Sequence, residues 1–164
     1  GVGTLGAAVQ ELKRRRLMEP IRQSIQEAKP FLGLCLGLQL LFEESQESPG
    51  VKGLGIFSGR VKRFCPRSSL KIPHMGWNQI QRSPSSEKKN PLLKGIPNGA
   101  FMYFVHSFYA DLSKRSRLVS AWTDYSRHFP SVIWNGQKVW ATQFHPEKSQ
   151  RWGLKLLKNF LGQV

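Results

Sequence analysis

The sequence predicts a single α/β domain with a parallel core and an antiparallel extension. Its 164 residues suit one domain that buries a core of its own. A short apolar segment at residues 31–34 leads directly into a helical pattern, as a buried parallel strand leads into its helix. Short runs of β-branched and aromatic residues then fill the second half. This order of elements is typical of α/β proteins.

Two helices are predicted between Leu5 and Lys29. Apolar residues recur at helical spacing on two successive faces, the first with Leu5, Ala8, Val9 and Leu12 and the second with Leu17, Ile21 and Ile25. We expect a break near Arg16 and Leu17. Pro20 falls early in the second helix, where a proline costs little.

The buried strand at residues 31–34 is predicted to end in a sharp turn with Cys35 at its apex. The leucines that follow, with Phe42, continue at helical spacing. Gly33 and Gly37 flank the thiol in a Gly-x-Cys-x-Gly arrangement that parallels the Gly-x-Ser-x-Gly nucleophile elbow of hydrolases. Small neighbours are needed there because the turn strains the backbone.

This elbow makes Cys35 a candidate nucleophile. The first amides of the following helix and its positive dipole end point toward the sulfur, which favours the reactive thiolate. The alternative is a buried structural cysteine, since a free cysteine also packs well as a small apolar residue.

The rest of the chain is predicted from its turns and its alternation. Residues 46–53 form a loop, residues 54–64 a strand with a turn at Ser58-Gly59, and residues 68–77 an irregular segment. Residues 82–99 form a proline-rich surface connection. Strands follow at residues 101–109, 117–123, 131–134 and 138–144, the last two joined by an Asn135-Gly136 hairpin, and a helix at residues 151–160 closes the chain.

His145 is the best candidate base for Cys35, because it comes directly off a predicted strand and precedes Pro146. A residue before proline is held extended, so His145 and Glu147, two positions apart, should project to the same side. A carboxylate there fixes the imidazole tautomer and leaves the other ring nitrogen to take the thiol proton. The alternative is an ordinary capped strand end.

The other three histidines have weaker claims to the chemistry. His74 lies in a loop-like aromatic segment that suits a docking surface or a turn packed on the core. His106 is expected near the site as a binding residue. His128 lies in a polar turn and is expected at the surface.

The composition limits the possible partners. The 25 Lys and Arg residues against 10 Asp and Glu give a formal charge of +15, but the basic residues lie in separate segments and do not alternate with exposed aromatics. Solvated faces are therefore the favoured explanation, ahead of a docking surface for an acidic partner or phosphorylated ligand, with nucleic acid last. No apolar run approaches the roughly 20 residues of a membrane span. We expect neither nucleic acid nor a membrane as partner.

Cysteine usage indicates a reducing compartment. Cys35 and Cys65 cannot form a disulfide framework and lack a zinc-binding spacing, so we expect a cytoplasmic protein without a metal. The given sequence begins with Gly1 rather than methionine and shows no signal-peptide pattern, so we expect a fragment or a processed form.

Taken together, residues 30–42 and His145-Pro146-Glu147 resemble the class I (triad) glutamine amidotransferases. Within that class, residues 71–78, 103–107 and 143–149 are similar to the glutaminase subunits of imidazole glycerol phosphate synthases, over nearly the whole chain. The resemblance implies one type 1 amidotransferase domain over residues 1–164. Its fold would be a flavodoxin-like three-layer sandwich with a mostly parallel central sheet and an antiparallel extension.

The resemblance also implies an activity and a set of site residues. Cys35, His145 and Glu147 would hydrolyse L-glutamine through a glutamyl thioester, without a cofactor. The Leu36 amide and the Val2-Gly3 loop would stabilise the oxyanion. The substrate would be held by Gln39, Glu47, His106 and Ser107. The ammonia would pass to a (β/α)8 cyclase subunit in a heterodimer, at a face formed by His74, Met75, Gly76, Trp77, Asn78, Tyr103 and Lys148.

The chain departs from this family at its start. Members have a leading strand, helix and strand before a Pro-Gly-Val-Gly turn, whereas this sequence begins inside that turn. At least one βα unit, roughly 30 residues or more, is therefore missing by comparison. We expect this chain alone to be poorly stable and nearly inactive, because backbone groups normally paired would be exposed. Leu38, where the family often has methionine, conserves volume.

Three alternatives remain beside this reading: the glutaminase of another biosynthetic synthase, a catalytically impaired subunit that only binds, and a basic nucleic-acid binder. The intact Cys35, His145 and Glu147 argue against the second, and the dispersed charge argues against the third.

Overall fold

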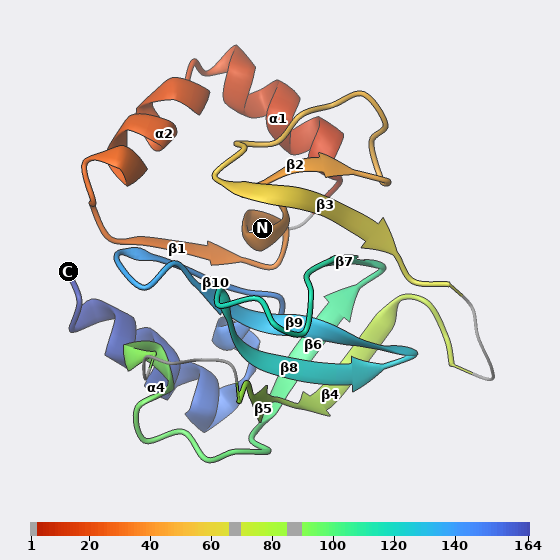
Figure 1. Ribbon diagram of the computed structural model, residues 1–164, viewed down its shortest axis with the longest axis vertical. Helices are drawn as coiled ribbons and strands as arrows, with labels where there is room; N and C mark the ends of the chain where they lie inside the picture. Colours follow the sequence, from red (N-terminus) through yellow and green to blue (C-terminus); the bar gives the residue numbers. More distant parts are fainter. Residues whose placement is uncertain (1–2, 66–69, 85–89) are drawn as a thin grey trace.

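The computed structural model describes residues 3–65, 70–84 and 90–164. Its elements, in chain order, are α1 (Leu5–Arg14), α2 (Met18–Gln26), β1 (Phe31–Leu34), α3 (Leu36–Gln39), β2 (Phe42–Ser45), β3 (Phe57–Arg63), β4 (His74–Gln79), β5 (Gln81–Arg82), η1 (Pro91–Leu93), β6 (Phe101–His106), β7 (Phe108–Ala110), β8 (Val119–Tyr125), β9 (Arg127–Trp134), β10 (Val139–Thr142), η2 (Pro146–Lys148) and α4 (Gln150–Leu161). Helices α1 and α2 lie on one side of the strands and α4 on the other (Figure 1).

The strands form three mixed or antiparallel sheets. Five strands follow the order β1-β10-β9-β8-β5, three the order β2-β3-β7, and β4 pairs with β6. The predicted α/β class is confirmed, but the central sheet is less parallel than expected: among the described strands, only β1 with β10 and β2 with β3 run parallel. Strands β8, β9 and β10 follow one another through short turns, and such turns require antiparallel pairing.

The two predicted N-terminal helices are confirmed. Thr4 caps α1 by accepting a hydrogen bond from the amide of Ala7 at 3.3 Å. The break between the helices falls where predicted, at Arg16, which has a φ of 56°. Leu5, Val9 and Met18 bury their side chains in a core cluster that includes residues of α3, β2 and β3.

The helix after the elbow is shorter than predicted. It ends at Gln39, and Phe42 begins a strand. The carbonyls of Leu40 and Leu41 do not continue the helix because they accept hydrogen bonds from the amides of Leu54 and Ile56 at 2.7 and 2.8 Å. Contacts with the 53–57 segment thus override the local helical spacing.

Two further predictions about the middle of the chain are wrong. Residues 57–63 form one continuous strand, and Gly59, with a φ of 120°, lies beside a register shift rather than in a reversing turn. Residues 68–77 are expected to be irregular, but residues 74–77 belong to β4, which pairs in full antiparallel register with residues 101–106. Residues 68 and 69 lie outside the described residues. A pairing partner so distant in sequence leaves no local signal.

The 82–99 connection also differs from prediction in its described part, because it packs into the interior. Leu92, Leu93 and Ile96 are buried in a second, aromatic-rich core cluster that also contains Leu156 of α4. Asn159 of α4 donates hydrogen bonds to the carbonyls at 92 and 94, at 2.9 and 2.8 Å. This segment is therefore part of the domain core.

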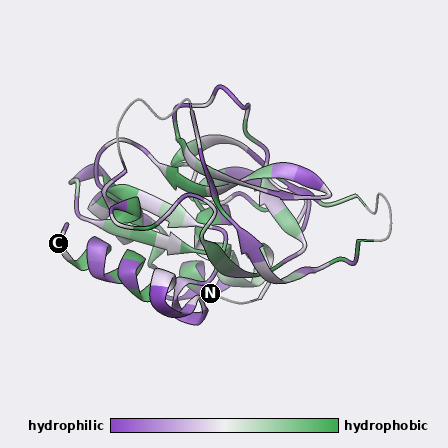
Figure 2. Ribbon diagram, turned by 90° about the horizontal axis from the view of Figure 1, so that it is seen from below, coloured by the Kyte–Doolittle hydropathy of each residue, from purple (hydrophilic) through white to green (hydrophobic). Residues whose placement is uncertain are grey.

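Hydrophobic residues gather on the inner strands, whereas α4 carries a hydrophilic stripe on its outer side (Figure 2). Within the ranges that the structure describes, no helix combines the length and apolar character that crossing a membrane requires.

The elbow predicts opposite effects for its two glycines. A Cβ at Gly33 would lie 2.7 Å from the carbonyl oxygen of Gly37, whereas a Cβ at Gly37 meets nothing within 4 Å. We expect Gly33→Ala to lower the free energy of unfolding by about 1–3 kcal/mol, because backbone must move. Gly37→Ala should be neutral or stabilising by up to about 1 kcal/mol, since alanine favours helix. Urea unfolding of both variants measures this, and equal effects would contradict the packing described.

Candidate active site

The site is built where two parallel strands end side by side. In the β1·β10 pair, Leu34 lies opposite Thr142, so Cys35 and Gln143 follow immediately at adjacent carboxyl ends. The amide of Cys35 donates to the carbonyl of Thr142 at 2.7 Å and fixes this register. Ligands of open α/β sheets bind at such carboxyl ends.

Cys35 has the strained backbone that a nucleophile elbow requires. Its φ of 49° and ψ of −102° place it outside the favoured regions for a non-glycine residue. The turn brings Gly33 so close to the backbone of Gly37 that position 33 has no room for a side chain. The residue is buried, with 7% of its surface exposed.

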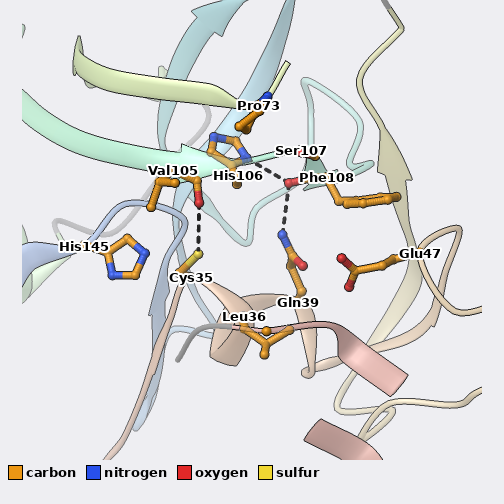
Figure 3. Close-up of a pocket in the computed structure, with 11 residues that line it drawn as sticks. Cys35, Leu36, Gln39, Glu47, Pro73, Val105, His106, Ser107, Phe108 and His145 are labelled. Atoms are coloured by element: carbon orange, nitrogen blue, oxygen red, sulfur yellow. Dashed lines mark hydrogen bonds between the residues drawn. The ribbon is translucent and has the colours of Figure 1, made fainter. Parts of the chain in front are cut away.

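His145 and Glu147 form a hydrogen-bonded pair beside this cysteine. His145 Nδ1 lies 2.6 Å from Glu147 Oε1. When the carboxylate is ionised it only accepts, so Nδ1 carries the proton and Nε2 keeps its lone pair. His145 Nε2 is buried without a hydrogen-bond partner among the described residues. The imidazole and the Cys35 sulfur lie next to each other at one end of the cavity (Figure 3).

The backbone around His145 is held by a buried serine to which the sequence analysis gave no role. Ser149 Oγ donates to the His145 carbonyl at 2.6 Å and accepts from the Tyr103 amide at 2.9 Å. The amide of His145 in turn donates to the Tyr103 carbonyl at 2.9 Å. Strand β6 thus fixes the segment that carries the candidate base.

A cavity of about 260 Å³ opens in front of Cys35. Its lining includes eight of the residues that the resemblance implies for the site: Gly3, Cys35, Leu36, Gln39, Glu47, His106, Ser107 and His145. The cavity is also lined by Pro73, Val105 and Phe108, which the sequence analysis did not assign to the site. Val2, expected at the oxyanion loop, lies outside the described residues.

The environment of the sulfur differs from the prediction of a thiolate at rest. Burial raises the pKa of the Cys35 thiol, while hydrogen bonds from the Leu36 amide and the Gln143 side chain lower it and the Glu147 charge raises it further. Burial wins, so the helix amide reduces the cost of ionisation without removing it. The neutral thiol points to the Val105 carbonyl at 3.8 Å. Such a thiol needs a base, and His145 is adjacent.

Glu47 has a structural bond as well as a position in the cavity. Its Oε2 accepts a hydrogen bond from the Leu5 amide at the start of α1, at 2.7 Å. The carboxylate is therefore held facing the cavity on the side opposite His145 (Figure 3).

Only some residues of the predicted partner face are exposed in the structure. Met75 and Trp77 are exposed, at 62% and 46%, whereas His74 is buried and presents no surface. Alternation along β4 explains this, because neighbouring residues of a strand face opposite sides. Tyr103 joins the exposed side, with its ring 5.9 Å from that of Trp77 and 6.0 Å from Lys148 Nζ. Gly76 and Asn78 are half-buried.

His74 and His106 form a second buried pair. His106 Nδ1 lies 2.8 Å from the Phe108 carbonyl, so it must be the donor, and its Nε2 must accept from His74 Nδ1 at 3.0 Å. His74 Nε2 then accepts from Asn78 Nδ2 at 3.2 Å. Burial lowers the pKa of His74 to about 4 and that of His106 to about 3, so both rings are neutral near pH 7.

His128, predicted in a surface turn, lies within β9 instead and is partly exposed. It bonds to Asp124 Oδ1 at 2.7 Å and stacks on Trp122. Nowhere in the described ranges do three or more His, Cys, Asp or Glu side chains gather in a way that would hold a metal.

Comparisons with known proteins agree with this geometry. The sequence profile of the family "Glutamine amidotransferase class-I" matches residues 2–164. The chain belongs to the class-I glutamine amidotransferases. Solved structures of this class share the fold: a glutamine amidotransferase aligns with a TM-score of 0.68 at 16% identity, covering 98% of this chain and 75% of that one. One from Thermotoga maritima gives 0.57 at 18% identity, covering 99% and 61%.

Curated relatives narrow the family further. This amidotransferase is 45% identical to the "imidazole glycerol phosphate synthase subunit HisH" of Desulfitobacterium hafniense over 98% of its own length and 72% of the relative's. The subunits of the same name from Methanocaldococcus jannaschii and Thermococcus kodakarensis are each 46% identical over 98% of this chain, and the alignments cover 76% and 78% of their lengths.

The neutral histidine pair predicts a pH-dependent stability. Their folded pKa values lie below the usual 6.5, so between pH 6.5 and about 4 the unfolded chain binds more protons than the folded one. The free energy of unfolding should therefore fall as the pH is lowered through this window, by about 1.4 kcal/mol per histidine and pH unit at most.

Urea unfolding at a series of pH values tests this. His74→Gln should flatten the decline, whereas His128→Gln, which replaces a partly exposed histidine, should keep it. An unchanged slope in His74→Gln would show that the pair is not the source.

Proposed function

We propose that this chain is the glutaminase subunit of an imidazole glycerol phosphate synthase, acting in the cytoplasm in histidine biosynthesis. It hydrolyses L-glutamine to glutamate and ammonia and supplies the ammonia to a cyclase subunit. One observation carries the chemistry: a strained cysteine and a buried histidine with a free ring nitrogen meet in one cavity. The identity of about 45% to subunits of that name supports the choice of pathway.

In the first half-reaction, His145 Nε2 takes the thiol proton and the Cys35 sulfur attacks the side-chain amide carbon of glutamine. Glu147 keeps the imidazole in the required tautomer and stabilises the imidazolium that forms. His145 then gives the proton to the leaving nitrogen, and ammonia departs to leave a glutamyl thioester. The raised pKa of the Cys35 thiol makes this coupled transfer more important than a resting thiolate.

In the second half-reaction, water replaces ammonia. His145 accepts a proton from the water as it attacks the thioester carbonyl, and returns that proton to the departing sulfur. Glutamate leaves and the neutral thiol is restored. Neither half-reaction calls on a metal or a cofactor.

Other residues of the cavity would stabilise the oxyanion and hold the substrate. The Leu36 amide would stabilise the oxyanion from the helix side, and the Val2-Gly3 loop would supply the second donor, as the resemblance implies. Glu47 would attract the substrate's α-ammonium group, since it is a carboxylate in the cavity wall. Gln39, His106 and Ser107 would complete the pocket.

The cyclase subunit, a (β/α)8 barrel in this proposal, would dock on the exposed face of β4 and β6. Met75, Trp77 and Phe101 expose large apolar side chains there, and Tyr103 and Lys148 continue the face. This face adjoins the site, because the Tyr103 backbone binds the His145 segment directly. Exposed apolar clusters of this kind mark protein interfaces.

Glutamate release from glutamine, measured with and without a purified cyclase subunit, tests this function. Cys35→Ala should abolish release, and Glu147→Gln should reduce it by about a hundredfold or more, because the tautomer is no longer fixed. Release that persists in Cys35→Ala would refute the mechanism.

The cyclase arm of the same experiment tests the partner face. Trp77→Ala should raise the cyclase concentration needed for half-maximal stimulation by about tenfold or more. Leu154→Ala, which shortens an even more exposed apolar side chain on α4, is the matched control and should leave that concentration unchanged. No stimulation by the cyclase in the wild-type chain would favour the glutaminase of another synthase.

A further inference from the structure

Gln143 is fully buried and lies directly against the nucleophile. It follows Thr142 at the end of β10, just as Cys35 follows Leu34 at the end of β1, and Leu34 and Thr142 are paired. Its Nε2 lies 3.7 Å from the Cys35 sulfur, and its Oε1 lies 3.2 Å from Gln39 Nε2. The nitrogen and the oxygen of the Gln143 side-chain amide therefore both have partners at the site.

The orientation of this amide follows from a backbone carbonyl. The Phe108 carbonyl can only accept, so Gln39 must present its NH2 group to it, at 2.9 Å. The same NH2 group faces Gln143, which must accept the hydrogen bond through its side-chain oxygen. The NH2 group of Gln143 is then left to donate to the sulfur.

The Phe108 carbonyl is itself fixed by the histidine pair. It accepts a second hydrogen bond from His106 Nδ1, at 2.8 Å, so both of its lone pairs are used. His106 is held in that tautomer by His74, and His74 by Asn78. The Phe108 carbonyl is thus the acceptor on which two series of hydrogen bonds meet, one from Asn78 through His74 and His106 and one from Gln39, which also donates to Gln143.

We propose that Gln143 is a further catalytic residue of this amidotransferase, whose side-chain N–H donates a hydrogen bond to the Cys35 sulfur and stabilises it as the thiolate forms. Gln39 acts on the sulfur through Gln143 and is, in this respect, a positioning residue, beside any contact it makes with substrate. The inference rests on the proposed function for its consequence in turnover, but the hydrogen bond itself concerns the free protein.

A hydrogen-bond donor to the sulfur is needed here because the sulfur is buried. Burial raises the pKa of the Cys35 thiol, and the Gln143 hydrogen bond opposes that rise. A donor that is already oriented in a buried site stabilises charge without reorganising when the charge appears.

The test is the pH profile of Cys35 alkylation by iodoacetamide in a Cys65→Ser background, because Cys65 is exposed and would also react. Gln143→Met removes the donor at similar length, and we expect the apparent thiol pKa to rise by about one unit or more, as for loss of a hydrogen bond to a charged atom. Gln143→Glu keeps an acceptor for Gln39 but places an acceptor against sulfur, so the rise should be larger. Gln137→Met, at an exposed position, is the matched control.

Turnover provides the second readout. In both Gln143 variants the kcat for glutamine should fall about tenfold or more with little change in KM, because the lost contact is to sulfur. A wild-type alkylation profile in folded Gln143→Glu, or faster alkylation than wild type, would overturn the proposal. Alkylation requires no glutamine. The expected profiles in a chain that shows no glutaminase activity even with the cyclase subunit would therefore refute the proposed function and leave this inference standing.

Discussion

The parallel pairing of β1 with β10 is the constraint on which the site depends. It joins residues that are more than a hundred positions apart, and its last bond, from the Cys35 amide to the Thr142 carbonyl, places the nucleophile beside Gln143 and the His145 segment. The tight packing of Gly33 on Gly37 then turns the chain so that the sulfur faces the cavity. If this register shifted by one residue, the side chains of Gln143 and its neighbours would face the opposite side of the sheet.

Burial has two effects on the site, one on the Cys35 thiol and one on the histidine pair. It raises the pKa of the Cys35 thiol, which disfavours the thiolate. It also keeps His74 and His106 neutral, so the two rings stay hydrogen-bonded to each other and to the Phe108 carbonyl that accepts from Gln39. Polar networks in a dry environment are useful only when every member is paired. In this network the described partners account for each ring nitrogen and amide group discussed, and His145 Nε2 is left for the reaction.

Much of the fold and the placing of Cys35 and His145 in one cavity could be predicted from local sequence, because helical spacing, the glycines around Cys35 and the extended residue before Pro146 act over a few positions. The roles of Gln143, Ser149 and the Phe108 carbonyl could not, since they arise only when β10, β6 and β1 meet. For the same reason the sequence leaves His74 open between a docking surface and a turn packed on the core, and the resemblance puts it on the partner face. Its burial follows from pairing with His106, and no short-range pattern reports that pairing.

The central claim is that Cys35 carries a covalent intermediate formed in this cavity. Acid quenching during glutamine turnover, in the presence of the cyclase subunit, followed by peptide mass spectrometry, tests it most directly. The account predicts that the peptide containing Cys35 gains the mass of one glutamyl group and that the peptide containing Cys65 gains none. Glutamate release with no label on Cys35, or with the label on another residue, would contradict it.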